Sequence, residues 1–362
     1  MSTVRVLLCM LGLCLQSCSS QAEEPPVVSE AMNTYYTRQS RICDVMNDPA
    51  FGDYGRLIFP VNTGYWSGTT LEQLQLTWYN YINPDKTVEV CNHLRAHAND
   101  CFIDIYTEEE KQANPDLHNT GLFFFQSNSN APFAICNAGG GFSYVGAMHD
   151  SFPHALELSK LGYNAFALIY RPSDAYEDLA RAIAYICDHA DELGVSRTGY
   201  SLWGGSAGAR MAATLGNSAN LHSLTGRTDL PQASAVIMQY TGYTTVSQYD
   251  GPTYACCGTS DGIASWRTMQ SRLESLSALG IPTEFHSYNG LPHGFGLGTG
   301  TVAEGWLQDA VHFWQQQSGA TAIHSAKANA GRSEAIYSLN GIRSNAMQKG
   351  INIVDGRKVV IR

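Results

Sequence analysis

Residues 203–208 are Trp203-Gly204-Gly205-Ser206-Ala207-Gly208, a serine in a Gly-x-Ser-x-Gly pattern. The short apolar run 200–203 before the pattern predicts a strand, and residues 207–215 after it predict a helix. A sharp strand-turn-helix bend holds a serine hydroxyl open to substrate on one side and to a base on the other. Glycines at 204 and 208 allow the close backbone approach that this bend needs. We therefore predict that Ser206 is a nucleophile.

The sequence around the motif alternates short apolar runs with helical patterns, which is typical of a parallel sheet with crossover helices. The predicted strands are 133–137, 165–170, 200–203, 233–240, 253–258 and 283–288, and earlier strands are expected at 101–106 and 121–126. The predicted helices are 152–161, 176–193, 207–215 and 263–279. The fold class is therefore α/β, with a mostly parallel central sheet flanked by helices, and residues 115–318 form the catalytic core.

A serine hydroxyl is a weak nucleophile unless a base takes its proton. His293 lies in a glycine-flanked loop, Leu291-Pro292-His293-Gly294-Phe295-Gly296, directly after the last predicted core strand. His286 falls within that strand and His312 on a terminal helix, and a structural role suits both. We therefore expect His293 to be the base.

The third group of such a site is a carboxylate that orients the imidazole and stabilises its cation. Asp261 follows the strand 253–258 and precedes a predicted helix, so it fits this role. An aspartate before a helix is also a common N-cap, which is the competing interpretation. Asp250 is the main rival for the acid and Glu284 a weaker one, and the sequence leaves this choice open.

Three consecutive glycines, Gly139-Gly140-Gly141, follow the strand 133–137. Chain without side chains can approach a ligand closely, and preorganised backbone amides stabilise a developing oxyanion. We expect the amides of Gly140, Gly141 and Ala207 to form this oxyanion hole. Residues just beyond the glycines, Tyr144, Met148 and His149, together with Tyr243, are the expected substrate contacts.

These motifs resemble those of the α/β-hydrolase superfamily, near its hormone-sensitive-lipase-like and acetyl-xylan or feruloyl esterase branch. The resemblance rests on 137–142, 204–208 and 258–261 with 293–295, and it covers about residues 115–316. In that branch a histidine usually begins the glycine motif, whereas Ala138 stands there in this chain. The resemblance implies hydrolysis of carboxylic esters through Ser206, Asp261 and His293, with no metal or organic cofactor.

The two ends of the chain carry targeting patterns. Arg5 precedes an apolar run too short to span a membrane, and 15–18 (Leu-Gln-Ser-Cys) resembles a bacterial lipobox, so residues 1–18 are expected to be a signal peptide. Lipidation of Cys18 is the leading interpretation, and simple cleavage nearby is the alternative. We expect an exported protein, either at the envelope or surface of a Gram-negative, Bacteroidetes-like bacterium, anchored to membrane only through that lipid, or secreted.

The segments outside the core have less defined roles. Residues 19–114 are rich in aromatics (Tyr54, Phe59, Tyr65, Trp66, Trp78, Tyr79 and Tyr81), and 51–60 and 71–82 are expected to form a cap over the active site. Residues 319–332 are expected to be a linker. The tail, 333–362, is expected to be a small β-hairpin module because apolar runs flank Asp355-Gly356. It resembles the C-terminal sorting modules of secreted Bacteroidetes proteins.

The charge argues against nucleic-acid binding, and the cysteine pattern argues against a disulfide framework or a zinc site. The net charge is −10 over 362 residues, although 319–362 hold seven basic and two acidic residues, so the body is strongly acidic and nucleic-acid binding is not expected. Seven cysteines outside the signal region show neither a disulfide framework nor zinc spacing. Buried free thiols are expected, with a Cys91–Cys101 pair as the alternative, and no metal site.

The leading hypothesis is a serine esterase that deacylates carbohydrate or small-molecule esters. A serine peptidase of the prolyl-oligopeptidase type shares the motif order, but no propeller-length domain precedes the core. A catalytically dead surface lipoprotein that binds glycan is the alternative from a different class.

Overall fold

The computed structural model describes residues 35–61 and 68–329, together with the strand residues 336–338, 343–344, 350–354 and 357–361. The signal region with Cys18, the aromatic residues Tyr65 and Trp66, and the turn at Asp355-Gly356 lie outside the described residues.

The core is an eight-stranded sheet in the order β1-β2-β4-β3-β5-β6-β7-β8. Neighbours from β4 to β8 run parallel, and β1 and β2 pair antiparallel at one edge. The strands are β1 Phe102–Ile103, β2 Gly121–Phe125, β3 Phe133–Asn137, β4 Asn164–Ile169, β5 Ser201–Gly205, β6 Ala235–Gln239, β7 Thr253–Gly258 and β8 Thr283–Tyr288. The six core strands predicted from the sequence are all present within a few residues of their expected bounds. The expected strand 101–106 is only two residues long.

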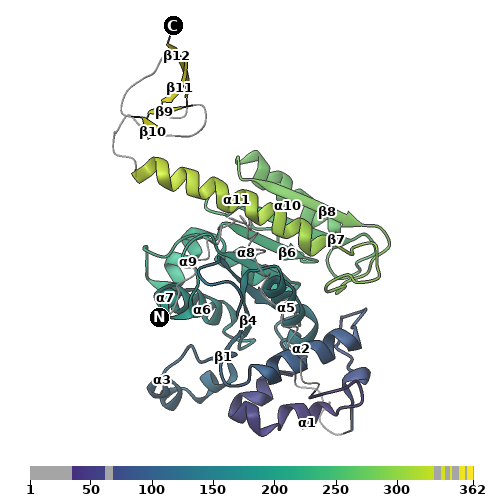
Figure 1. Cartoon of the computed structure of the whole chain (residues 1–362). Coiled ribbons are helices and arrows are strands. Elements are labelled where there is room, and N and C mark those ends of the chain that lie inside the picture. Colours follow the sequence, from purple (N-terminus) through teal and green to yellow (C-terminus); the bar gives the residue numbers. More distant parts are fainter. Residues whose placement is uncertain are drawn as a thin grey trace, which may run out of the picture. The chain divides into compact units, whose positions relative to one another are not determined.

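Helices connect and flank this sheet (Figure 1). Helices α5, α8, α10 and α11 pack directly on its strands. The helices of the described chain are α1 Ile42–Met46, α2 Pro84–Ala96, α3 Glu108–Ala113, α4 Ala147–Asp150, α5 Phe152–Lys160, α6 Ala175–Asp188, α7 Ala190–Leu193, α8 Ala207–Leu215, α9 Ser218–Thr225, α10 Trp266–Ala278 and α11 Trp306–Asn329, with 3₁₀ turns η1 Pro49–Leu57, η2 Leu71–Gln73 and η3 Pro115–Asn119.

Burial explains why the strands lack the alternating pattern of a half-exposed sheet. Every residue of β2 to β7 is buried, because helices cover the parallel strands and remove both of their faces from water. The indoles of Trp203, Trp306 and Trp314 meet in this core, with ring centroids 6.0 and 6.4 Å from Trp203. This order of strands with its crossover helices is the α/β-hydrolase fold, as the sequence motifs imply.

Three boundaries differ from the sequence prediction. The helix expected over 176–193 is two helices, α6 and α7, with His189 between them. The helix expected from residue 263 begins at Trp266, after Ser265 as its N-cap. The expected linker 319–332 instead continues helix α11 as far as Asn329. Low content of large apolar residues does not break a helix, since the alanines in this stretch favour one.

The tail strands β9 Ile336–Ser338, β10 Arg343–Ser344, β11 Gly350–Val354 and β12 Arg357–Ile361 form a separate four-stranded sheet in the order β10-β9-β11-β12. Strands β11 and β12 pair antiparallel, with Val354 opposite Arg357. This is the register expected of a hairpin that turns at 355–356.

Candidate active site

The parallel strands end level with one another, and this brings together loops that are distant in sequence. Asn137 at the end of β3 is opposite Gly204 of β5, and Gly205 is opposite Gln239 of β6. The loops after these strands, and after β7 and β8, therefore meet at the carboxyl edge of the sheet, where open α/β sheets bind ligands. All of the sequence-predicted site residues that the structure describes, Tyr243 after β6 included, lie in, or one helical turn beyond, loops that begin at this edge.

Ser206 lies at the bend between β5 and α8, in a conformation that few non-glycine residues adopt. Its φ is 53° and its ψ is −114°. The bend is held by a hydrogen bond from the amide of Ser206 to the carbonyl of Gln239, 3.0 Å. A side chain at Gly204 would meet the backbone of Gly208 at 2.2 Å, and one at Gly208 would meet the carbonyl oxygen of Asn137 at 1.9 Å. The glycines of the motif are therefore required by backbone contact.

His293 connects Ser206 to Asp261. Its Nε2 is 3.1 Å from the Oγ of Ser206, and its Nδ1 is 2.8 Å from Oδ2 of Asp261. The side chain of His293 is 6% exposed and that of Asp261 is fully enclosed. A buried histidine that is hydrogen-bonded through both ring nitrogens is held in one orientation between the hydroxyl and the carboxylate.

Asp261 contacts His293 and closes a turn, whereas the N-cap of α10 is Ser265. While Oδ2 faces His293, Oδ1 accepts hydrogen bonds from the amides of Ile263 and Ala264, each 2.8 Å. Burial by itself would raise the pKa of Asp261. The hydrogen bonds from His293 and from these amides outweigh burial and hold the pKa below the ordinary value for aspartate.

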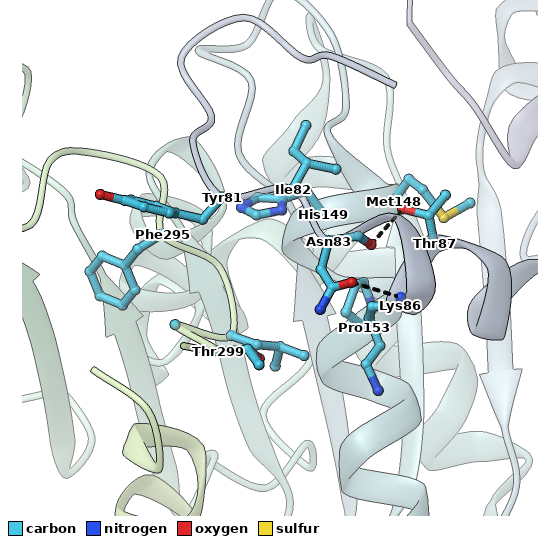
Figure 2. Close-up of a pocket in the computed structure, with 12 residues that line it drawn as sticks. Tyr81, Ile82, Asn83, Lys86, Thr87, Met148, His149, Pro153, Phe295 and Thr299 are labelled. Atoms are coloured by element: carbon cyan, nitrogen blue, oxygen red, sulfur yellow. Dashed lines mark hydrogen bonds between the residues drawn. The ribbon is translucent and has the colours of Figure 1, made fainter. Parts of the chain in front are cut away.

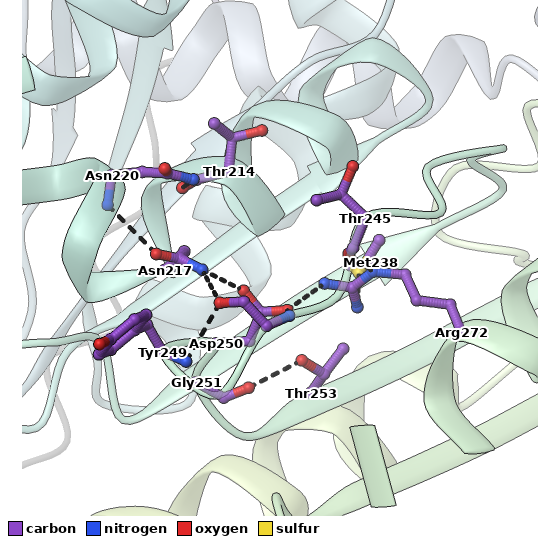
Figure 3. Close-up of polar contacts among 12 residues, drawn as sticks. Thr214, Asn217, Asn220, Met238, Thr245, Tyr249, Asp250, Gly251, Thr253 and Arg272 are labelled. Carbon is purple, nitrogen blue, oxygen red and sulfur yellow. Dashed lines mark hydrogen bonds and ion pairs between the residues drawn. The ribbon is translucent and has the colours of Figure 1, made fainter. Parts of the chain in front are cut away.

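The rival carboxylates lie elsewhere. Asp250 accepts hydrogen bonds from Asn217, 2.6 Å, and from the buried guanidinium of Arg272, 3.2 Å, as Figure 3 shows. Glu284 is hydrogen-bonded to His286, 2.7 Å, on β8. Neither carboxylate is a partner of His293. The geometry therefore favours Asp261 over both rivals as the third group of the site.

The glycine loop lies beside the nucleophile. A side chain at Gly139 would come within 2.9 Å of the Cβ of Ser206. The amide of Gly139 already donates to Asp150, 2.8 Å, whereas no hydrogen bond from the amide of Gly140 or Gly141 to another described residue is formed. Ala207 begins helix α8, where first-turn amides have no partner within the helix. Three amides are thus free near Ser206 for an oxyanion.

A segment far upstream completes the site. Asn80 donates from its amide to the carbonyl of Gly294, 3.2 Å, and from its side chain to the carbonyl of His293, 3.1 Å. A side chain at Gly141 would lie 2.9 Å from the ring of Trp78, which is 44% exposed. Part of the expected cap, 71–82, therefore touches both the histidine loop and the glycine loop. Sequence reasoning placed this segment near the site but missed the individual roles of Tyr79 and Asn80.

The four expected substrate contacts have different surroundings. Met148 and His149 are buried and line a cavity of about 20 Å³ with Tyr81, Asn83 and Phe295 (Figure 2), room for about one water molecule. The His149 ring is hydrogen-bonded to the carbonyl of Gly294, 3.0 Å, and burial lowers its pKa.

The two tyrosines of that set differ in exposure. Tyr144 is buried, stacks on Trp78 and donates to the carbonyl of Thr77. Tyr243 is half-buried between the guanidinium groups of Arg210 and Arg272. Tyr144, Met148 and His149 thus support the walls of the site, and contact with substrate stays a prediction for all four residues.

The structure also describes the cysteines, the groups that could bind a metal ion and the hydropathy of the helices. The seven cysteines of the described chain are all free, and all but Cys43 are buried, so Cys91 and Cys101 are not joined. Within the described ranges, no group of three or more metal-binding side chains is arranged to hold an ion. Of the helices that the structure describes, none has the length and hydropathy to cross a bilayer.

Comparison with known proteins supports the fold. The family model BD-FAE matches residues 125–260, less than half of the chain, a range that contains the glycine loop and Ser206 but neither Asp261 nor His293. An acetyl ester-xyloside bifunctional hydrolase from Caldicellulosiruptor lactoaceticus is 18% identical, with a TM-score of 0.51 over 59% of this chain and 95% of that one. No curated protein matches the sequence.

Two further solved structures have lower TM-scores. They are the α/β hydrolase MGS-M1 from a Medee basin deep-sea metagenome library (21% identity, TM-score 0.48, 60% of this chain and 97% of that one) and a sugar hydrolase from Lactococcus lactis (20%, 0.47, 56% and 95%). The family model and the Caldicellulosiruptor structure agree with the α/β-hydrolase fold described above.

Proposed function

We propose that the protein is a serine carboxylic-ester hydrolase that works through an acyl-enzyme on Ser206. The observation that carries the proposal is the hydrogen-bonded series Asp261–His293–Ser206 at a bend where Ser206 has a positive φ. The geometry is the one that acyl transfer needs, because nucleophile, base and orienting carboxylate are within reach of one another before substrate binds.

In the proposed reaction, Oγ of Ser206 attacks the ester carbonyl carbon while Nε2 of His293 takes the hydroxyl proton. Asp261 stabilises the imidazolium that forms. The amides of Gly140, Gly141 and Ala207 donate to the tetrahedral oxyanion. When the ester C–O bond breaks, His293 returns its proton to the leaving alcohol. Water then attacks the acyl-enzyme by the same route and releases the acid and Ser206.

The substrate is proposed to be an acylated carbohydrate. The match to the BD-FAE model supports this class, as does the likeness to the Caldicellulosiruptor protein, an acetyl ester-xyloside bifunctional hydrolase. The exposed ring of Trp78 beside Gly141 supports it as well, because a flat apolar ring can lie against the face of a sugar or of an aromatic acyl group. We also propose export to the cell envelope, with Cys18 as the lipid-attachment residue.

Hydrolysis of p-nitrophenyl acetate by the protein and by Ser206→Ala tests the reaction. We expect the substitution to lower kcat by about 10⁴-fold or more, because loss of the nucleophile removes the acyl-enzyme route. Equal rates for the two proteins would contradict the proposal and favour a glycan-binding protein without activity.

A panel of acetylated and feruloylated xylo-oligosaccharides, with a peptide p-nitroanilide beside them, then identifies the substrate class. Cleavage of the anilide alone would favour the peptidase alternative.

A further inference from the structure

Asp150 is a buried carboxylate that the reaction described above does not use. It is the last residue of the short helix α4, and it is 2% exposed. Its hydrogen-bond donors are one backbone amide and two phenols. Gly139 donates to Oδ2, 2.8 Å, Tyr79 donates to Oδ2, 3.0 Å, and Tyr240 donates to Oδ1. A buried carboxylate is costly unless its oxygens are hydrogen-bonded, so these donors are what makes its burial tolerable.

The two phenols remain donors over the working pH range of proteins. Burial, followed by the charge of Asp150, raises the pKa of Tyr79 and the pKa of Tyr240 well above the ordinary value for tyrosine. Both hydroxyls therefore keep the proton that they share with the carboxylate. The three contacts form one fixed unit rather than a set of exchangeable partners.

Each donor belongs to a different wall of the active site. Gly139 begins the glycine loop, and its peptide leads directly into the amides of Gly140 and Gly141. Tyr240 follows β6, accepts from the amide of Gly296, 3.3 Å, and packs its ring against that of His293 with centroids 4.9 Å apart. Tyr79 belongs to the upstream segment. Asp150 thus joins the glycine loop, the histidine loop and this segment at one point.

The carboxylate also touches the bend that carries the nucleophile. A side chain at Gly205 would meet Oδ2 of Asp150 at 2.2 Å, so the residue before Ser206 must be glycine for the carboxylate to lie where it does. Asp150 is in contact with both the glycine loop and the bend, and it therefore contributes to the distance between them. An oxyanion hole formed by one amide from the bend and two from the loop depends on that distance.

We propose that Asp150 is a positioning residue for the reaction at Ser206. It holds the Gly139 amide, and thereby aims the amides of Gly140 and Gly141, while through Tyr240 it supports the loop of His293. The inference rests on the proposed function. Its consequence is a defect expressed in the transition state, because the amides are needed most when charge develops on the carbonyl oxygen.

The test is Asp150→Asn, which keeps the size of the side chain and removes acceptor capacity. We expect kcat for p-nitrophenyl acetate to fall by about 10²-fold, the loss seen when one oxyanion donor is removed. KM should change by less than about threefold, because ground-state binding does not use the aimed amides. Affinity for a boronic acid, which forms a tetrahedral adduct with the serine, should fall in parallel with kcat.

The matched control is Asp250→Asn, at an enclosed carboxylate that is paired with Arg272 away from the site. We expect it to lower Tm while kcat stays within about threefold of the parent protein, because it removes stability without touching the loops. If the loss of Asp150 caused only a general packing defect, both variants would have a lower Tm, and their kcat and boronate affinity would be the same. That result would contradict the positioning role.

Tyr79→Phe and Tyr240→Phe give a second test if Asp150→Asn does not fold, because each removes only one hydroxyl. Each should lower kcat by several-fold, and, where Asp150→Asn does fold, combining either with it should add little, since the pair acts as a unit. Variants that fold and keep the parent kcat and boronate affinity would overturn the positioning role. The reaction itself fails separately, if Ser206→Ala is as active as the parent.

Discussion

At the scale of single residues, the site depends on unusual local states that their neighbours make tolerable. The positive φ of Ser206 costs of the order of 1–3 kcal/mol, and the surrounding backbone contacts hold the residue there. Asp261 divides its oxygens between His293 and two backbone amides, so the same carboxylate orients the base and closes a turn. One residue therefore serves both stability and the proposed chemistry.

The lowered pKa of Asp261 makes a prediction about stability against pH. A carboxylate whose folded pKa lies below its unfolded value, roughly 4 for aspartate, stabilises the fold above that value. This contribution is lost as the pH falls through the folded pKa. We therefore expect Asp261→Asn to lower the free energy of unfolding most at pH 6 to 7, and the penalty to shrink below about pH 4. Urea unfolding of both proteins at pH 6 and pH 3 measures it, and a penalty of equal size at the two pH values would contradict the assignment.

At the scale of elements, the geometry of the site depends on how closely helix α8 packs against strand β3. Gly208 is in backbone contact with Asn137, and this contact sets how close the bend at Ser206 lies to the loop of Gly139. The loops after β7 and β8 are adjacent because the two strands end together, with Gly258 as the register partner of Tyr288. Parallel pairing with matched ends aligns Asp261 and His293 with Ser206.

Gly208→Ala tests this spacing. The added Cβ would lie 1.9 Å from a backbone oxygen, so helix α8 must shift away from β3. We expect a loss of about 1–3 kcal/mol of stability, as for overpacked cores, and a fall of about 10²-fold in kcat from the displaced nucleophile.

Gly319→Ala is the control for this change. Residue 319 lies in helix α11 with nothing within 4 Å of an added Cβ, so this substitution should stabilise the helix by up to about 1 kcal/mol and leave kcat unchanged. Thermal unfolding and ester hydrolysis of the three proteins make the comparison. Similar effects for both glycines would show that backbone contact is not the reason for Gly208.

At the scale of the whole molecule, two sheets divide the described chain. The eight-stranded sheet carries every residue of the proposed site, whereas strands β9 to β12 pair only with one another. The upstream segment with Tyr79 and Asn80 belongs functionally to the first sheet, although the family model that matches the chain begins only at residue 125.

A chain that ends at Asn329 should therefore keep its Tm and its kcat, because no strand of the core sheet loses a pairing partner. A chain that ends at Gly305 is the control. It lacks α11 and the buried indoles of Trp306 and Trp314, and we expect it not to fold. Differential scanning fluorimetry and ester hydrolysis of the purified chains measure both outcomes.

The proposed attachment of the protein to the cell envelope through Cys18 also concerns the whole molecule. Cys18→Ala should move the full chain from the membrane fraction to the soluble fraction without changing kcat. An unchanged distribution between fractions would contradict lipid attachment at Cys18.

The motif residues show how far the sequence could predict the site. Ser206, His293 and Asp261 could be predicted because each is next to glycines or a strand end, features that local sequence displays. Only the fold could separate Asp261 from the alternative acids Asp250 and Glu284, since hydrogen bonding to His293 depends on contacts between distant residues. The start of α10 was misplaced because Asp261, which resembles an N-cap in sequence, closes a turn four residues before the true cap, Ser265.

The glycines, the apolar runs and the chain order of Ser206, Asp261 and His293 were determined by the sequence alone, because strand, bend and helix preferences act over a few residues. Only the tertiary structure decided which carboxylate meets His293, that Asn80 holds the histidine loop, and that Asp150 gathers Gly139, Tyr79 and Tyr240. Those contacts join residues as many as 213 positions apart. No local preference encodes such contacts, because burial and sheet register bring the groups together only when the whole chain has folded.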